Sequence, residues 1–206
     1  MKHCSLILAL SVLVLGTGCK SEVDNKPAAE VTETTATTET TSTALTTTDP
    51  TPGADLRKVV KEKSKIEFVA AKVTRDHKGG FRNFDGWIEF MGGKPSRIAF
   101  DIDLNSVYTD DEKLTGHLQS PDFFDVARYP KATFVSTALV DAPAGSPPGT
   151  THSVTGKFNL HGVEKDITIP VKTTITPEGV RTTSEFTINR HDWGISYRGA
   201  ADDLIK

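Results

Sequence analysis

The chain has 206 residues and a formal net charge of −3, and its 24 Lys and Arg are interspersed with 27 Asp and Glu. Such mixed charge excludes the basic footprint of a nucleic-acid-binding protein. The only cysteines, Cys4 and Cys19, lie near the N-terminus. The rest of the chain therefore has no disulfide framework and no cysteine-based metal site.

The N-terminus has the parts of a secretory signal: a basic start, an apolar run over residues 6–15, and small residues up to Gly18. The run is too short to span a membrane. Cys19 follows directly, and this order resembles a bacterial lipoprotein signal, in which that cysteine is acylated. We predict a signal peptide over residues 1–18 and a lipid anchor on Cys19. An ordinary secreted protein is the alternative.

Residues 20–55 are rich in Thr, Glu, Ala and Pro and contain no aromatic residue. Such a segment buries too little apolar surface to offset its chain entropy, so we expect disorder. The predicted division is an acylated cysteine with a Thr-rich tether over 19–58 and a folded domain over 59–206. The tether is either a spacer that holds the domain off a membrane or a leader without function.

The folded domain shows recurring two-residue alternation of apolar and polar side chains, with Gly- and Pro-rich turns between the runs. Residues 75–80 are read as a polar loop because of their charge and two glycines. About seven strands without a helical period predict an all-β, mainly antiparallel sandwich or barrel. The predicted strands are 65–70, 84–90, 98–105, 131–140, 153–160, 167–175 and 181–188.

One insertion breaks this pattern. Strand alternation stops over residues 110–118, where a short helix could start, and Phe123 and Phe124 follow Ser120-Pro121-Asp122. Ser120 or Asp122 is a suitable N-cap for a helical turn. We expect this insertion to cap one end of the domain, with the two phenylalanines as an apolar plug.

Chemical signatures are sparse. His77, His117, His161 and His191 lack metal-ligand spacing, and no Gly-x-Ser-x-Gly nucleophile motif is present. We therefore expect no metal, no cofactor and no enzymatic activity. The segment 190–194, with its charges beside Trp193, is either a contact for a polar headgroup at a channel mouth or a structural corner.

An ordered set of motifs resembles one family, the YceI-like, lipocalin-like, polyisoprenoid-binding periplasmic proteins. The likeness covers residues 64–206. The motifs are Phe81-x-x-Phe84-x-Gly86-x-Ile88, Asp101-Ile102-x-Leu104-x-Ser106-Val107, His117-Leu118-x-Ser120-x-Asp122-Phe123-Phe124-Asp125-Val126, Tyr129-Pro130-x-Ala132-x-Phe134, and Gly156-x-Phe158-x-Leu160-His161-Gly162-Val163-x-Lys165.

The resemblance implies a lipocalin-like antiparallel β-barrel whose apolar channel holds a long isoprenoid tail, of a polyprenyl or quinone-type lipid. Where the family has a final strand, this chain stops after residues 202–206, so we expect an open barrel edge. The implied lipid-binding residues, which simple core packing would explain equally well, are Phe68, Phe84, Ile88, Phe90, Ile98, Phe100, Ile102, Leu104, Leu118, Phe123, Phe124, Phe134, Phe158, Leu160, Ile167, Ile169, Phe186 and Trp193.

The expected function is isoprenoid carriage or storage in the bacterial cell envelope. The protein would lie on the periplasmic side of a membrane, preferably the outer membrane, held by acylated Cys19. Two alternatives remain. A hydrolase or isomerase would gather His and Asp side chains at the barrel mouth, whereas a structural lipoprotein would have a filled core.

Overall fold

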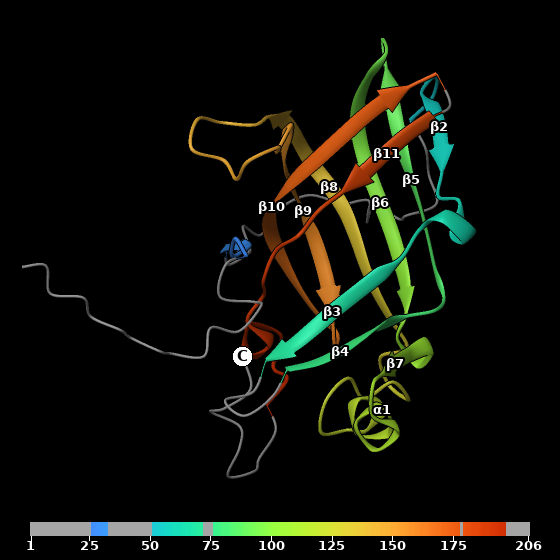
Figure 1. Ribbon diagram of the computed structural model, residues 1–206, viewed down its shortest axis with the longest axis vertical. Coiled ribbons are helices and arrows are strands. Elements are labelled where there is room, and N and C mark those ends of the chain that lie inside the picture. The colour runs from blue at the N-terminus through green and yellow to red at the C-terminus, as the bar shows by residue number, and fades with distance from the viewer. Residues whose placement is uncertain (1–25, 33–50, 72–75, 178, 197–206) are drawn as a thin grey trace, which may run out of the picture.

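The computed structural model describes residues 26–32, 51–71, 76–177 and 179–196. These residues form eleven strands and one α-helix, and every strand pairing is antiparallel apart from an isolated parallel bridge between Ala28 and Thr187 (Figure 1). The predicted all-β, antiparallel class with one helical insertion is confirmed. None of the described helices is long and apolar enough to cross a membrane.

Most strands belong to one large sheet, and their alternating apolar side chains face its inner side. Its order is β1 (Glu30–Thr32), β10 (Val163–Thr176), β9 (His152–Leu160), β8 (Lys131–Asp141), β6 (Lys94–Asp103), β5 (Phe84–Met91) and β2 (Asp55–Lys58), with β11 (Gly179–Thr183) also on β10. The last strand was predicted over residues 181–188, which is too long. The observed strand β11 ends at Thr183, and Phe186 and Ile188 lie beyond it and pack against the interior.

A second sheet contains β3 (Ile66–Ala71), β4 (Asp76–Phe81) and β7 (Val107–Thr109). Figure 1 shows β3 and β4 crossing in front of the large sheet. Among the described residues no strand pairing joins the two sheets, so the described strands form two sheets packed through side chains and not a closed barrel. Residues 202–206, on which the expected open edge rests, lie outside the described residues.

The strand β4 was misread as a loop because its glycines hide the alternation. A Cβ atom on Gly79 would lie 2.6 Å from Cζ of Phe68, and one on Gly80 would lie 2.7 Å from the Tyr108 hydroxyl oxygen. The two aromatic side chains therefore lie over consecutive glycines. Because consecutive strand residues face opposite sides of a sheet, one aromatic covers each face of β4.

Adding a methyl group at Gly80 is therefore expected to destabilise the small sheet. Gly80→Ala should lower the free energy of unfolding by about 1–3 kcal/mol, the usual cost of overpacking. In the control Gly116→Ala, nothing lies within 4 Å of the new methyl group, and removing a helical glycine should raise stability by roughly 0.5–1 kcal/mol. Urea denaturation measures both. Equal effects would contradict the close packing over β4.

Two described segments of the expected tether are ordered. The Ala29 N–H donates to the Thr187 carbonyl oxygen (2.8 Å), the Thr187 N–H donates to the Pro27 carbonyl oxygen (2.8 Å), and Val31 pairs with Ile167. The strand β2 likewise pairs with β5. Backbone pairing to an open sheet edge needs little apolar side-chain area. The expectation of disorder is therefore wrong for residues 26–32 and 55–58, whereas the domain boundaries stay a prediction.

The insertion closes one end of the interior, as expected, but with different capping. The helix α1 (Glu112–Gln119) is N-capped by Asp111, whose side chain accepts from the Lys113 and Leu114 amides (2.8 and 3.2 Å). Ser120 is the C-cap, not an N-cap, and the two phenylalanines follow in a turn. We call this side of the molecule, with α1 and that turn, the capped end.

A short 3₁₀ turn, η3 (Leu104–Ser106), links β6 to β7 at the capped end. Asp103 caps it, accepting from the Asn105 side chain (3.1 Å) and the Asn105 backbone N–H (3.0 Å). The hydrogen bond from the Asn105 side chain is the main cause that lowers the pKa of Asp103 below its ordinary value. Leu104 in this turn is fully buried, so the turn places an apolar side chain under the cap.

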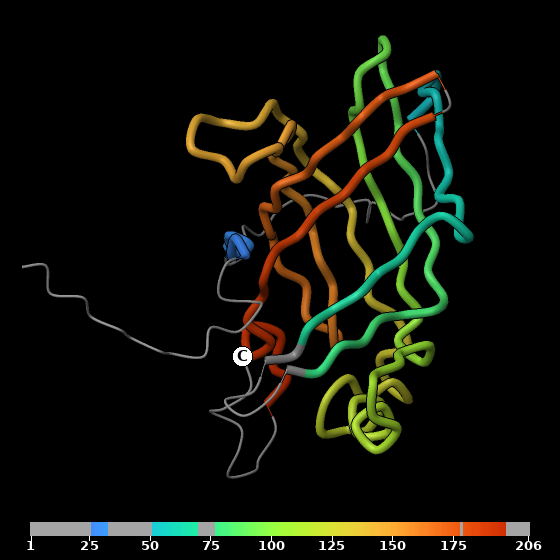
Figure 2. Tube along the Cα trace, in the orientation of Figure 1, coloured from blue at the N-terminus to red at the C-terminus, as the bar shows by residue number. Residues whose placement is uncertain are grey.

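At the opposite end the large sheet divides. The pairing of β6 with β8 covers only Ala99–Asp103 and Lys131–Val135, after which the Ile98 N–H donates to the Ser136 hydroxyl (2.8 Å). Beyond that point β8 pairs only with β9. Figure 2 shows the two strands diverging upwards. We call this side, with the β5–β6, β8–β9 and β10–β11 turns, the uncapped end.

Candidate functional site

The candidate site is the apolar interior between the two sheets. Of the eighteen residues expected to line it, all but Ile88 and Phe90 belong to one continuous hydrophobic cluster. Ten are buried: Ile102, Leu104, Leu118, Phe123, Phe134, Phe158, Leu160, Ile167, Ile169 and Trp193. Six are partly buried: Phe68, Phe84, Ile98, Phe100, Phe124 and Phe186. Their role in lipid binding stays a prediction.

Register across the large sheet places three phenylalanines side by side. Phe100 pairs with Phe134, which in turn pairs with Phe158 on the next strand. The rings of Phe100 and Phe134 are stacked with centroids 5.1 Å apart. Gly156 provides the room, because a Cβ atom there would lie 2.6 Å from Cζ of Phe134. The inner face therefore carries a row of three aromatic rings among aliphatic side chains.

The small sheet covers this layer through aromatic contacts. The Phe68 and Phe81 ring centroids lie 5.7 Å apart, and Phe81 lies 6.0 Å from Phe124 of the cap. Phe81 was absent from the predicted lining, although its strand position opposite Ile66 would have indicated it had β4 been recognised. These aromatic contacts connect β3 and β4 to the interior, and Asn83, in the link from β4 to β5, accepts from the Asp103 N–H of β6 (3.0 Å).

The segment 190–194 closes the capped end as a structural corner. Trp193 is fully buried, its Nε1–H donates to the Phe158 carbonyl oxygen (3.4 Å), and the two rings meet edge to face at 5.4 Å. Arg190 donates to the Ile195 carbonyl oxygen (2.7 Å) and lies 5.7 Å above the Phe123 ring. Ile195, also buried, follows a glycine with no alternating pattern, so nothing in the sequence marked it as core.

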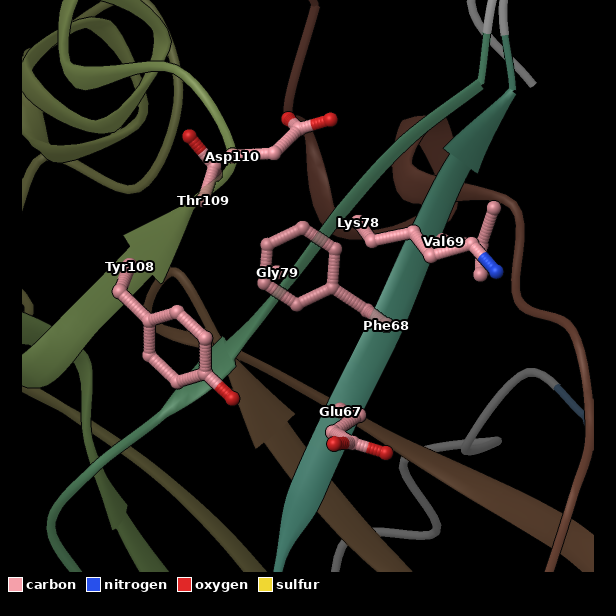
Figure 3. Close-up of a pocket in the computed structure, with 8 residues that line it drawn as sticks. All are labelled: Glu67, Phe68, Val69, Lys78, Gly79, Tyr108, Thr109 and Asp110. Atoms are coloured by element: carbon pink, nitrogen blue, oxygen red, sulfur yellow. The ribbon is translucent and has the colours of Figure 1, made fainter.

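A pocket of about 340 Å³ lies at the small sheet, beside the interior. Its size is at the lower end of the roughly 300–1,000 Å³ range of small-molecule sites. Phe68 both lines this pocket and packs against the core, so polar and apolar surroundings meet there (Figure 3). The lining residues are Glu67, Phe68, Val69, Lys78, Gly79, Tyr108, Thr109 and Asp110.

The histidines are spread over separate places. His77 Nδ1 lies 2.9 Å from an Asp110 carboxylate oxygen at the pocket, whereas His117 lies 3.6 Å from Asp122 at the cap. His161 Nδ1 lies 3.3 Å from the Trp193 carbonyl oxygen. The part of the chain that the structure describes has no group of three or more His, Cys, Asp or Glu placed to hold a metal ion. The pocket lining includes no serine or cysteine nucleophile.

The outer face of the large sheet carries a smaller cluster that sequence reasoning missed. Trp87 packs there with Ala99 and Val135. Next to it, Glu89 is only 1% exposed and accepts from the Thr51 N–H (2.7 Å) and the Thr51 hydroxyl (2.8 Å). These contacts fix the chain entering β2. The two tryptophans of the protein therefore lie on opposite faces of the sheet wall.

The fold and its interior define a class of antiparallel β protein with an apolar core enclosed between two sheets. A YceI-like domain model matches residues 58–206, and the chain belongs to the YceI-like family. UPF0312 proteins of Pseudomonas savastanoi pv. phaseolicola and Pseudomonas putida strain W619 are each 34% identical over 137 residues, covering 62% of this chain and 68% of each relative.

Among solved structures, Burkholderia cenocepacia BcnA is 26% identical and gives a TM-score of 0.61 over 71% of this chain and 91% of that chain. The two chains share one fold. A domain from Saccharophagus degradans, described as polyisoprenoid binding and implicated in plant cell wall breakdown, is 27% identical over 52% of this chain and 61% of that chain. Its TM-score of 0.38 is too low to support a structural comparison.

Proposed function

We propose that the protein binds a long-chain isoprenoid lipid, of polyprenyl or quinone type, with the tail in the apolar interior. The observation that carries this proposal is the continuous hydrophobic cluster between two sheets that share no strand pairing among the described residues. Family membership supports the same function. Strand β4 leads directly into β5, and the Asp103 N–H of β6 donates to the Asn83 carbonyl oxygen (3.0 Å), so the small sheet is tied to the large one at that junction. An opening for a tail would lie along the remaining length of the small sheet, where the two sheets meet through side chains.

The position of the pocket at Phe68 suggests which end of the ligand points inward. An amphiphile needs a polar site next to an apolar one, and Thr109 and Asp110 offer polar groups where Phe68 reaches the core. We infer that a headgroup occupies the pocket and that the tail runs inward past Phe68. Each isoprene unit then contributes on the order of 3 kcal/mol by burial of apolar surface. A few units offset the ordering costs of binding.

Carriage or storage fits these surroundings better than catalysis. A single His77–Asp110 pair lies at the pocket, and the lining has no serine or cysteine beside it. Hydrolysis or isomerisation requires a base positioned against a nucleophile or a substrate proton. The apolar interior instead offers a place where a tail is sheltered from water.

The two tryptophans allow a direct test of entry into the interior. Trp193 lies inside and Trp87 outside the wall, so a Trp87→Phe variant reports from the interior alone. A short-chain isoprenoid quinone should quench Trp193 emission saturably, and an isoprenoid alcohol of equal length should compete with it. Emission that falls only linearly, without competition, would mean that the quinone does not enter.

We also propose that acylated Cys19 holds the protein at the periplasmic side of the bacterial outer membrane. The apolar run ending at Gly18-Cys19 supports this location. Cys19→Ser should move the protein from the membrane fraction to the soluble periplasmic fraction, as followed by immunoblotting. A substitution at Ser21 serves as the control and should leave the distribution unchanged. A Cys19→Ser variant that stays membrane-bound would contradict the anchor.

A further inference from the structure

Exposed large apolar side chains occur on three separate hairpins at one end of the molecule. The described residues include four such side chains, Val60, Met91, Val140 and Ile175, each between 46% and 58% exposed. A single exposed apolar residue is ordinary, whereas several that can meet one surface together are a reason to look for an interaction site. All but Val60 belong to the uncapped end, because they lie at the ends of β5, β8 and β10 that lead into its turns (Figure 1).

One of these side chains has a basic partner across its own hairpin, since Met91 pairs with Lys94. Ile175 pairs with Val180, and the nearby Arg181 pairs with Thr174 on the opposite face of the hairpin. Apolar residues that enter a membrane interface are commonly flanked by Lys or Arg, whose stems reach back to the phosphate groups. Val140 differs, since Asp141 follows it. The capped end begins with the exposed acidic residues Asp110, Asp111 and Glu112.

The N-terminal strand approaches from the same side. β1 is antiparallel to β10, with Glu30 opposite Thr168 and Thr32 opposite Asp166. β10 runs from the capped towards the uncapped end, so β1 runs the opposite way and begins on the side of the uncapped end. An ion pair between Lys26 and Glu185 holds the start of this segment. Lys26 is seven residues after Cys19.

We propose that the uncapped end docks on the surface of a lipid bilayer containing anionic lipid, with Met91, Val140 and Ile175 entering the interface. The docking rests on the membrane location in the proposed function but needs no bound isoprenoid. It places the divided end of the large sheet, where β6 and β8 separate, against the source of lipid. The capped end, closed by α1 and Trp193, then faces away from the bilayer.

Single added tryptophans test the orientation. The full chain, as processed by the cell, carries Met91→Trp, Ile175→Trp or Lys113→Trp and is mixed with vesicles of phosphatidylcholine and phosphatidylglycerol, with and without brominated acyl chains. Lys113 is exposed on α1 and gives the matched control at the capped end. The buried native tryptophans contribute the same background to all three variants.

The added emission should be lost to brominated lipid at positions 91 and 175 and kept at position 113. Quenching at 113 alone, equal quenching at all three positions, or no quenching at any would each overturn the docking. Concentration-dependent association that shields positions 91 and 175 without vesicles would also overturn it, since a second copy would then cover this end. Quenching without any co-purified isoprenoid would refute the proposed ligand and leave the docking intact.

Discussion

Replacing Trp193 by alanine is expected to lower the free energy of unfolding by about 3–5 kcal/mol, the usual cost of deleting a large buried aromatic side chain. The ring is fully buried and packs edge to face on Phe158, 5.4 Å away. Its Nε1–H also satisfies the Phe158 carbonyl oxygen. The loss should appear in urea denaturation as a lower midpoint with an unchanged slope, which indicates a change in stability alone.

The companion variant Trp193→Phe separates packing from the hydrogen bond. It keeps most of the ring volume, so its destabilisation should be smaller than that of Trp193→Ala. The exposed-site control Ile175→Ala should change stability little, because that side chain is 58% exposed. If Trp193→Ala cost no more than Ile175→Ala, Trp193 would not close the capped end.

Phe134→Ala is expected to lower stability by a similar amount and, at the same time, to enlarge the space available to a ligand. Phe134 is fully buried and stacks on Phe100 at 5.1 Å, so its removal should cost about 3–5 kcal/mol. The cavity left behind is apolar, and such cavities accept apolar ligands. The variant should therefore keep isoprenoid binding and recover stability as the ligand concentration rises, because binding to the folded state stabilises it.

Thermal unfolding with and without a short-chain isoprenoid alcohol measures this recovery. The ligand should raise the melting temperature of Phe134→Ala at least as much as that of the unsubstituted protein. The control Val135→Ala truncates a side chain of the outer-face cluster, so it should lose stability without gaining a larger response to ligand. If the ligand left the melting temperature of all three proteins unchanged, the interior would be a packed core that does not bind the ligand.

Two-residue alternation in the sequence was sufficient to locate most of the large sheet, because side chains alternate between an apolar interior and the outside. The same alternation also identified most residues of the interior, because sixteen of the eighteen expected residues belong to one hydrophobic cluster. Alternation cannot reveal β4, since Gly79 and Gly80 have no side chains to alternate and their faces are covered by Phe68 and Tyr108. It also cannot reveal β1, whose contribution is mainly backbone pairing to β10.

The pocket at the small sheet was beyond sequence reasoning for the same reason. Its walls come from β3, β4 and β7, and with β4 read as a loop nothing brought Lys78 next to Tyr108. Trp193 was correctly expected inside. The sequence could not decide whether residues 190–194 contact a headgroup or form a structural corner. That decision required the contacts of Arg190 with Ile195 and Phe123. Phe123 is far from Arg190 in the sequence, and Ile195 belongs to no regular alternating pattern.

Mass spectrometry of lipid extracted from the protein, purified from its native membrane without added ligand, tests isoprenoid binding most directly. The extract should contain an isoprenoid lipid in an amount comparable to the protein. The variant Phe68→Asp, which places a carboxylate where the pocket meets the interior, should carry much less, whereas the exposed-site control Val60→Asp should carry the same amount. An extract without isoprenoid lipid, or equal amounts from all three proteins, would contradict a tail held between the two sheets.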